Sequence, residues 1–151
     1  MLNLQLNLSK KSKQLNRNYI ITLKNKKEVS MSLPLVFRIF SGILFINFIG
    51  ATFVSEVWLE QANFVTSPSI ITLSQAFGVS LLGTAFIAFR VPVIAGENLA
   101  AFGQVFSIIS LFFVVLIGYH LLNGQVSGPT ATVNLLLNII FSALFFVSSK
   151  K

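Results

Sequence analysis

The 151-residue chain lacks cysteine and aspartate, and it has a single histidine, His120. Without cysteine there can be no disulfide framework, thiol redox pair, thiolate metal site or covalent haem attachment. One histidine cannot supply both axial ligands of a bis-histidine haem. The absence of aspartate excludes the Asp-rich metal motifs of membrane phosphotransferases. We therefore predict no cofactor and no catalytic activity of the chain's own.

Basic residues are concentrated at one end of the chain. The formal net charge of +7 at first suggests a nucleic-acid partner. However, residues 1–30 hold seven of the 11 Lys and Arg residues and only one glutamate, so we predict no such partner. Three interpretations of this segment remain open: a disordered basic tail, an extension that precedes a natural start at Met31, or an organellar targeting segment.

Four apolar stretches follow residue 30 and decide the class of protein. They cover residues 33–54, 70–89, 99–122 and 130–147, and none has an acidic or basic residue near its middle. A hydrocarbon core about 30 Å thick needs about 20 apolar residues in a helix. The hydrophobic content of 54% and the mean hydropathy of +0.82 exceed those of soluble domains. We predict that residues 31–151 form an all-α, four-helix bundle in a bacterial inner membrane or an organellar membrane.

The positions of the basic residues predict the orientation of the bundle. Arg38 lies at the start of the first span, Arg90 lies between the second and third spans, and Lys150 and Lys151 follow the fourth. The other two connections contain no Lys or Arg. By the positive-inside rule, both termini and the Arg90 connection face the cytoplasm, so the spans run up-down-up-down.

Two connections between the spans carry further signals. After the first span, Glu56 and Glu60 stand at helical spacing with Trp58 between them, and tryptophan at a span end commonly lies at headgroup depth. We expect the first span to continue for a turn or two and then to lie along the outer surface. Pro92 and Gly96 are expected to end the second span.

Small and polar residues inside the spans predict helix contacts. Ser74 with Gly78, and Gly103 with Ser107, follow the small-x-x-x-small pattern that lets helix backbones approach. Amide side chains also occur within the spans. One interpretation is that they hydrogen-bond across the bundle; the other is that they line a cavity that binds a small polar ligand, a quinone or a lipid. The candidate binding residues are Asn47, Gln75, Gln104, Asn134 and Asn138.

A second candidate site lies at the outer surface. The carboxylates of Glu56 and Glu60 are four residues apart, and the predicted topology places His120 on the same side of the membrane. Carboxylate and imidazole groups can together bind a divalent metal ion. The alternative is that His120 simply ends a helix in contact with water.

These residues bear on several classes of function. The scarcity of reactive side chains favours a non-enzymatic accessory subunit or small helical bundle, in the lipid bilayer as a homo-oligomer or within a larger membrane complex. A membrane enzyme would have to use Glu56, Glu60 and His120. Transporters usually keep an ionisable residue at mid-membrane. Because this chain has the uncharged Asn47 there, we do not expect a transporter. The alternative to the subunit is a membrane-embedded binder of the small molecules named above.

The segments FRIFSGILF, QAFGVSLLGTAFIAFR and NLLLNIIFSALFF resemble those of DoxX-like small four-helix membrane proteins. The resemblance covers residues 35–147 and includes Arg38 at the start of the first span, Gly78 and Gly83 in the second, and Arg90 at its end. It implies a four-helix membrane fold, and named members of that group are tied to quinone or sulfur-compound redox chemistry. Because this chain lacks cysteine, a thiol-based role is not expected.

Overall fold

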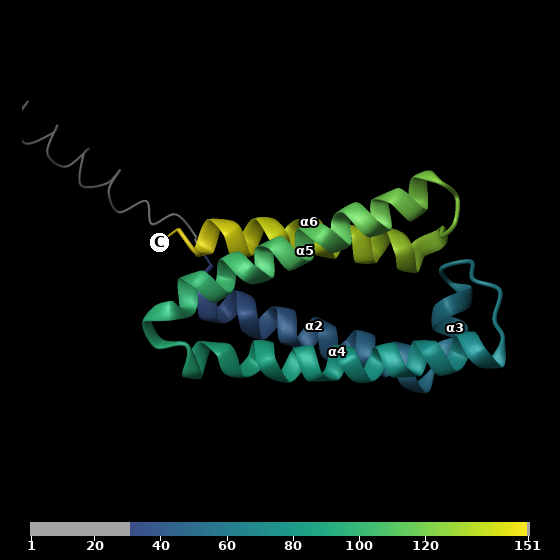
Figure 1. Ribbon diagram of the computed structural model, residues 1–151, viewed down its shortest axis with the longest axis horizontal. Helices are drawn as coiled ribbons and strands as arrows, with labels where there is room; N and C mark the ends of the chain where they lie inside the picture. Colours follow the sequence, from purple (N-terminus) through teal and green to yellow (C-terminus); the bar gives the residue numbers. More distant parts are fainter. Residues whose placement is uncertain (1–30, 151) are drawn as a thin grey trace, which may run out of the picture. The chain divides into compact units, whose positions relative to one another are not determined.

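The computed structural model describes residues 31–150, so the predictions for residues 1–30 lie outside it. The described residues form helices and no strands. In chain order (Figure 1) the elements are α2 Leu33–Phe53, α3 Ser55–Glu60, α4 Pro68–Ile94, the short 3₁₀ helix η1 Gly96–Asn98, α5 Leu99–Leu122 and α6 Gly128–Ser148.

Four of these helices are long and apolar enough to cross a membrane, namely α2, α4, α5 with η1, and α6. The prediction of an all-helical chain with four candidate spans is therefore confirmed for the described residues. The proline residues Pro34, Pro68 and Pro129 each lie within the first two positions of a helix. Proline suits this position because its backbone lacks a donor that would have no partner there.

Pro92 does not end the second span, contrary to the sequence prediction. Helix α4 continues through Pro92 to Ile94, and Ala95 N still donates to Val91 O over 2.9 Å. Proline removes the hydrogen bond of its own nitrogen and its ring crowds the carbonyl one turn earlier, but only Val93 and Ile94 of the helix follow it here. The helix ends where Gly96 adopts a φ of +53°, a backbone conformation that glycine tolerates.

Helices α2 and α4 form one closely packed hairpin, and small residues mediate the contact (Figure 1). Ser41 Oγ donates to Ala85 O over 2.8 Å, and Ser74 Oγ donates to Ala51 O over 3.1 Å. Gly78 is buried between the two helices, where a side chain on α4 would overlap Thr52 of α2. The prediction that Ser74 and Gly78 face a neighbouring helix is confirmed.

Helices α5 and α6 form the second hairpin by the same means (Figure 1). Ser107 Oγ donates to Ser142 O over 2.8 Å, and Ser142 Oγ donates to Ser107 O over 3.0 Å. One turn away, Gly103 is buried against Leu33 and Ser149. Gly103 and Ser107 thus make the contacts that their spacing predicts.

The two hairpins meet at one end in an aromatic cluster. Phe37 and Phe145 are fully buried, with ring centroids 4.8 Å apart, and Phe106 lies 5.1 Å from Phe37. This core combines the starts of α2 and α5 with the ends of α4 and α6. Its buried members are Leu33, Val36, Phe37, Ala88, Val91, Ala95, Phe106, Phe141 and Phe145.

At the opposite end, α3 and the turn after it connect the hairpins. Helix α2 breaks at Val54, so α3 is a separate helix rather than a continuation of the first span (Figure 1). Ser127 N donates to Ala62 O over 3.2 Å, and Thr130 Oγ1 donates to Gln61 Oε1 over 3.2 Å. Asn63 also hydrogen-bonds to Ser127 through their side chains. We call these contacts the α3–α6 junction.

Two glycines of α4 provide a matched test of the close contact between α2 and α4. Gly78→Ala should lower the free energy of unfolding by about 1–3 kcal/mol, since the new methyl group overlaps Thr52 in a packed interface. Gly83→Ala should be neutral or stabilising by about 0.5–1 kcal/mol, because open space surrounds Gly83 and alanine favours the helix. Unfolding by SDS titration in detergent micelles measures both. Equal effects would contradict the packing described here.

Candidate functional site

A cavity of about 700 Å³ lies between the two hairpins. All four long helices contribute to its wall, and so does the α3–α6 junction. Its volume lies within the range of small-molecule binding pockets, which is about 300–1,000 Å³. Most of the wall is apolar, from side chains such as Ile43, Leu81, Ile117 and Leu137.

Aromatic side chains close one end of the cavity. Phe40, Phe106 and Phe141 line it and also contact the aromatic cluster, with a centroid distance of 5.0 Å between Phe40 and Phe141. These three rings therefore form one end of the cavity. Beyond them, α2 and α6 present Asn47 and Asn134.

The α3–α6 junction closes the other end. Trp58, Ala62 and Thr130 belong to the wall there, together with His120 from the end of α5. The indole ring of Trp58 packs on Gly50, where an added Cβ would lie 2.8 Å from Trp58 Cδ1. This contact fixes α3 against α2 and holds the indole at the edge of the cavity.

Three of the five predicted amides line this cavity, and two do not. Asn47 on α2 and both Asn134 and Asn138 on α6 are half-buried members of its wall. Gln75 lies at a separate depression of about 340 Å³ beside α3, where its Nε2 donates to Thr52 O over 3.5 Å. Gln104 is exposed on α5 and lines neither space.

The amide of Asn138 is held by its own helix. Asn138 Nδ2 donates to Asn134 O, one turn earlier, over 2.8 Å. An amide group has a second N–H and an acceptor oxygen, so this bond orients the group without using all of its capacity. Asn138 is therefore an oriented polar group at the cavity wall.

Ser110 is the most unusual polar residue of the wall. Its side chain is 1% exposed, and its Oγ has no hydrogen-bond partner among the described residues. An unpaired buried hydroxyl costs about 1–3 kcal/mol, so such groups commonly have a partner. Thr52 Oγ1 is also buried without a partner, but it faces Gly78 across the α2–α4 contact. Ser110 belongs to the cavity wall, but its Oγ is itself buried and does not face the open space of the cavity.

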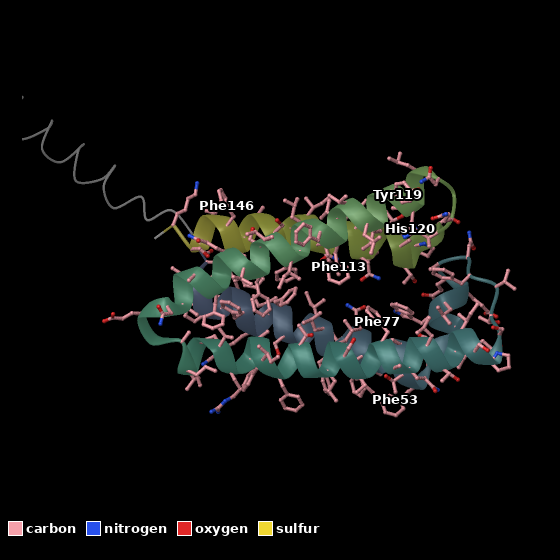
Figure 2. All side chains as sticks on the ribbon, viewed as in Figure 1. Phe53, Phe77, Phe113, Tyr119, His120 and Phe146 are labelled. Carbon is pink, nitrogen blue, oxygen red and sulfur yellow. The ribbon has the colours of Figure 1, made fainter. Side chains whose placement is uncertain are left out.

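The three candidate metal ligands do not form one cluster. Among residues 31–150 no group of three His, Cys, Asp or Glu side chains is close enough to hold a metal ion. Glu56 and Glu60 are exposed on α3, and Glu56 lies at the smaller depression. His120 lies at the larger cavity, and its Nδ1 is hydrogen-bonded to Gln125 Oε1 (Figure 2).

Sequence reasoning missed several polar members of the cavity wall. Two of them are Ser80 and Thr84, whose hydroxyls donate to backbone carbonyl groups within α4. Ser110 shares a helix face with Gly103 and Ser107, which signals burial. The shared face does not indicate that the Ser110 hydroxyl lacks a hydrogen-bond partner while the Ser107 hydroxyl has one. Spacing alone cannot separate these two roles.

Comparison of the chain with protein-family models, with curated proteins and with solved structures found no match. The site must therefore be interpreted from its own residues. It offers hydrogen-bonding amides and hydroxyls in an apolar enclosure and only one ionisable side chain, His120, among the described lining residues. Such a wall has the apolar surface and the few polar groups that small-molecule sites commonly use.

Two serines on α5 test whether the cavity wall holds an unpaired hydroxyl. Ser107→Ala should lower the free energy of unfolding by about 0.6–2 kcal/mol, because it removes a hydrogen bond between helices. Ser110→Ala should not destabilise the protein, since its hydroxyl has no protein partner to lose. SDS unfolding of protein freed of bound lipid compares the two. A loss as large at Ser110 as at Ser107 would show that Ser110 is paired.

Proposed function

We propose that this protein crosses the bilayer four times in an up-down-up-down bundle with both termini in the cytoplasm. The starts of α2 and α5 meet the ends of α4 and α6 in the aromatic cluster, which supports the alternation. Arg38, Arg90 and Lys150 all belong to that end of the bundle and are exposed. The opposite end, which contains Glu56 and Glu60, has no Lys or Arg among the described residues. This asymmetry is the one that the positive-inside rule requires.

The function that the geometry supports best is the binding of a small amphipathic molecule within the membrane. The observation that carries this proposal is the cavity between the hairpins, whose otherwise apolar wall brings together the half-buried amides Asn47, Asn134 and Asn138. An apolar enclosure with a few oriented polar groups is the usual form of a ligand site. Small-molecule binding thus has structural support that the accessory-subunit prediction does not have.

The cavity favours binding over conduction. A channel needs a continuous path across the bundle, whereas this cavity ends at Phe40, Phe106 and Phe141. Behind these rings lie the fully buried Phe37 and Phe145. Movement of ions past this cluster would require the core of the bundle to open.

The DoxX-like resemblance suggests a quinone as one possible class of ligand. A quinone head is uncharged and presents carbonyl acceptors, which match the second N–H of the Asn138 amide. Its apolar substituents match the remainder of the wall. The binding proposal does not depend on this choice of ligand, because any molecule with an apolar body and a hydrogen-bonding head meets the same requirements.

The single tryptophan of the chain allows a direct test of quinone binding, because Trp58 lines the cavity. A short-chain quinone should quench Trp58 fluorescence saturably in detergent-solubilised protein. Asn138→Leu should raise the Kd about tenfold, the value of one lost hydrogen bond of about 1.4 kcal/mol. Gln104→Leu makes the same chemical change outside the cavity and should leave the Kd unchanged.

Native mass spectrometry extends this test to other ligands. The wild-type protein extracted in mild detergent should retain a small-molecule adduct that Asn138→Leu reduces and Gln104→Leu does not. If quinone does not quench Trp58 but such an adduct is present, the quinone assignment fails and the binding function stands. Absence of both signals would refute the binding function.

The topology can be tested with single cysteines, since the chain has none of its own. Glu56→Cys should react with a membrane-impermeant maleimide in intact cells, because α3 lies on the outer side. Ser32→Cys and Glu97→Cys, also exposed, should react only after the membrane is permeabilised. Labelling of all three positions in intact cells would contradict cytoplasmic termini, provided that a cytoplasmic marker protein stays unlabelled.

A further inference from the structure

The wall of the cavity is covered unevenly by its four helices. On α2 and α6, every lining residue is buried or half-buried, including Asn47, Asn138 and Phe141. On α4 and α5, by contrast, several lining residues are exposed. These are Phe77, Ser80 and Ile87 on α4, and Ile109, Phe113 and Leu116 on α5. The cavity therefore opens sideways, between α4 and α5.

Two phenylalanines stand at this opening. Phe77 extends from α4 and Phe113 from α5 into the space between the two helices (Figure 2). Their side chains are 39% and 40% exposed, so each is partly covered by the cavity wall and partly free. Because α4 and α5 are candidate membrane spans, the medium outside this opening is the hydrocarbon of the bilayer.

The two ends of the cavity are more closed than its side, since Phe64 near the α3–α6 junction is the one exposed lining residue outside α4 and α5 among the described residues. The aromatic cluster closes one end, as described above. At the other end, Ser127 N bonds to Ala62 O and Thr130 bonds to Gln61, so polar contacts join the hairpins across the top of the cavity. A molecule arriving from water would have to break these contacts, whereas one dissolved in the bilayer would not.

The polar groups inside the cavity define the chemistry of the head that they would bind. Asn138 stands near the middle of α6, which the proposed topology places near the middle of the bilayer. The described wall has no Lys, Arg, Asp or Glu, and its one ionisable group, His120, is at the far end of α5. A charged head at this depth would be buried without a counter-charge, which is costly.

On the basis of the proposed binding function, we infer that the ligand is an uncharged lipid with a hydroxyl or carbonyl head, and that it enters sideways from the bilayer between α4 and α5. Its head hydrogen-bonds to the free N–H and the oxygen of the Asn138 amide at mid-membrane depth. Its apolar chain lies along the wall and leaves the cavity between Phe77 and Phe113.

Two photoreactive probes with the same chain test the chemistry of the head. A diazirine-bearing hexadecanol carries a hydroxyl head, and the matching hexadecanesulfonate carries a head that stays charged, because a sulfonate does not take up a proton as a carboxylate does on desolvation. With the wild-type protein in neutral phosphatidylcholine vesicles at pH 7.4, the alcohol should label cavity residues of α4 and α5. The sulfonate should label them about tenfold less at equal membrane concentration, which corresponds to about 1.4 kcal/mol of discrimination.

Pairs of introduced cysteines test the route. In Phe77→Cys/Phe113→Cys, a flexible bis-maleimide should tie α4 to α5 across the opening and reduce labelling by the alcohol at least about tenfold. Asn63→Cys/Ser127→Cys is the matched control. Its cross-link ties the α3–α6 junction, where the native side chains already bond to each other, and should leave labelling unchanged. Each pair without cross-linker provides the folding control.

The outcomes separate the inference from the binding function on which it rests. If the alcohol fails to label the cavity and no other small molecule binds, the binding function itself fails. If labelling survives the Phe77–Phe113 cross-link but is lost on cross-linking residues 63 and 127, the ligand enters from water and the sideways route is wrong. Equal labelling by alcohol and sulfonate would refute the uncharged head. If a variant with a cysteine pair does not fold, the entry route is judged from the peptides that the alcohol labels in the wild-type protein. Labels confined to the α3–α6 junction would also overturn the sideways route.

Discussion

The structure depends on one constraint, which is that polar groups in hydrocarbon must find partners within the protein. In each hairpin, small residues allow the helices to approach until serine hydroxyls reach the carbonyls of the neighbouring helix. Ser41 and Ser74 do so between α2 and α4, and Ser107 and Ser142 do so between α5 and α6. Because lipid is as apolar as leucine, these close contacts, rather than burial of apolar area, hold each pair together.

The contact between the two hairpins follows a different principle. Few direct contacts join α4 to α5 or α2 to α6, and those that do are grouped at the ends. Large rings such as Phe37 and Phe145 fill one end, and backbone and amide hydrogen bonds of the α3–α6 junction join the other. Between these two attachments the helices are held apart, and the cavity is the space that remains.

The sequence predicted the parts of this fold that depend on local composition. Apolar length determined the four spans, and the spacing of Ser74, Gly78, Gly103 and Ser107 determined which faces pack. It failed at Pro92, because a proline so close to the end of a helix removes one backbone hydrogen bond without interrupting a long helix. It ended the first apolar stretch at residue 54, where α2 breaks, but it did not predict that the helical residues beyond Val54 form the separate helix α3.

The candidate site was predictable only in part, since it depends on how the hairpins are arranged. Asn47, Asn134 and Asn138 meet at one cavity because α2 and α6 face each other across the bundle. Gln75 and Gln104 have the same chemistry, but their positions on α4 and α5 place them elsewhere. A single sequence specifies the face of a helix on which an amide lies, and only the tertiary arrangement specifies what that face meets.

The cavity also has a consequence for the stability of the bundle. A molecule bound between the hairpins would supply the contacts that α4 and α5 do not make with each other. Binding to the folded state alone stabilises a protein by RT ln(1 + [L]/Kd), which is about 2.7 kcal/mol at a ligand concentration of 100 Kd. That gain is comparable to the loss or gain of several hydrogen bonds between membrane helices. The association of the two hairpins should thus depend on occupancy of the cavity, whereas the Ser107–Ser142 contact within one hairpin should not.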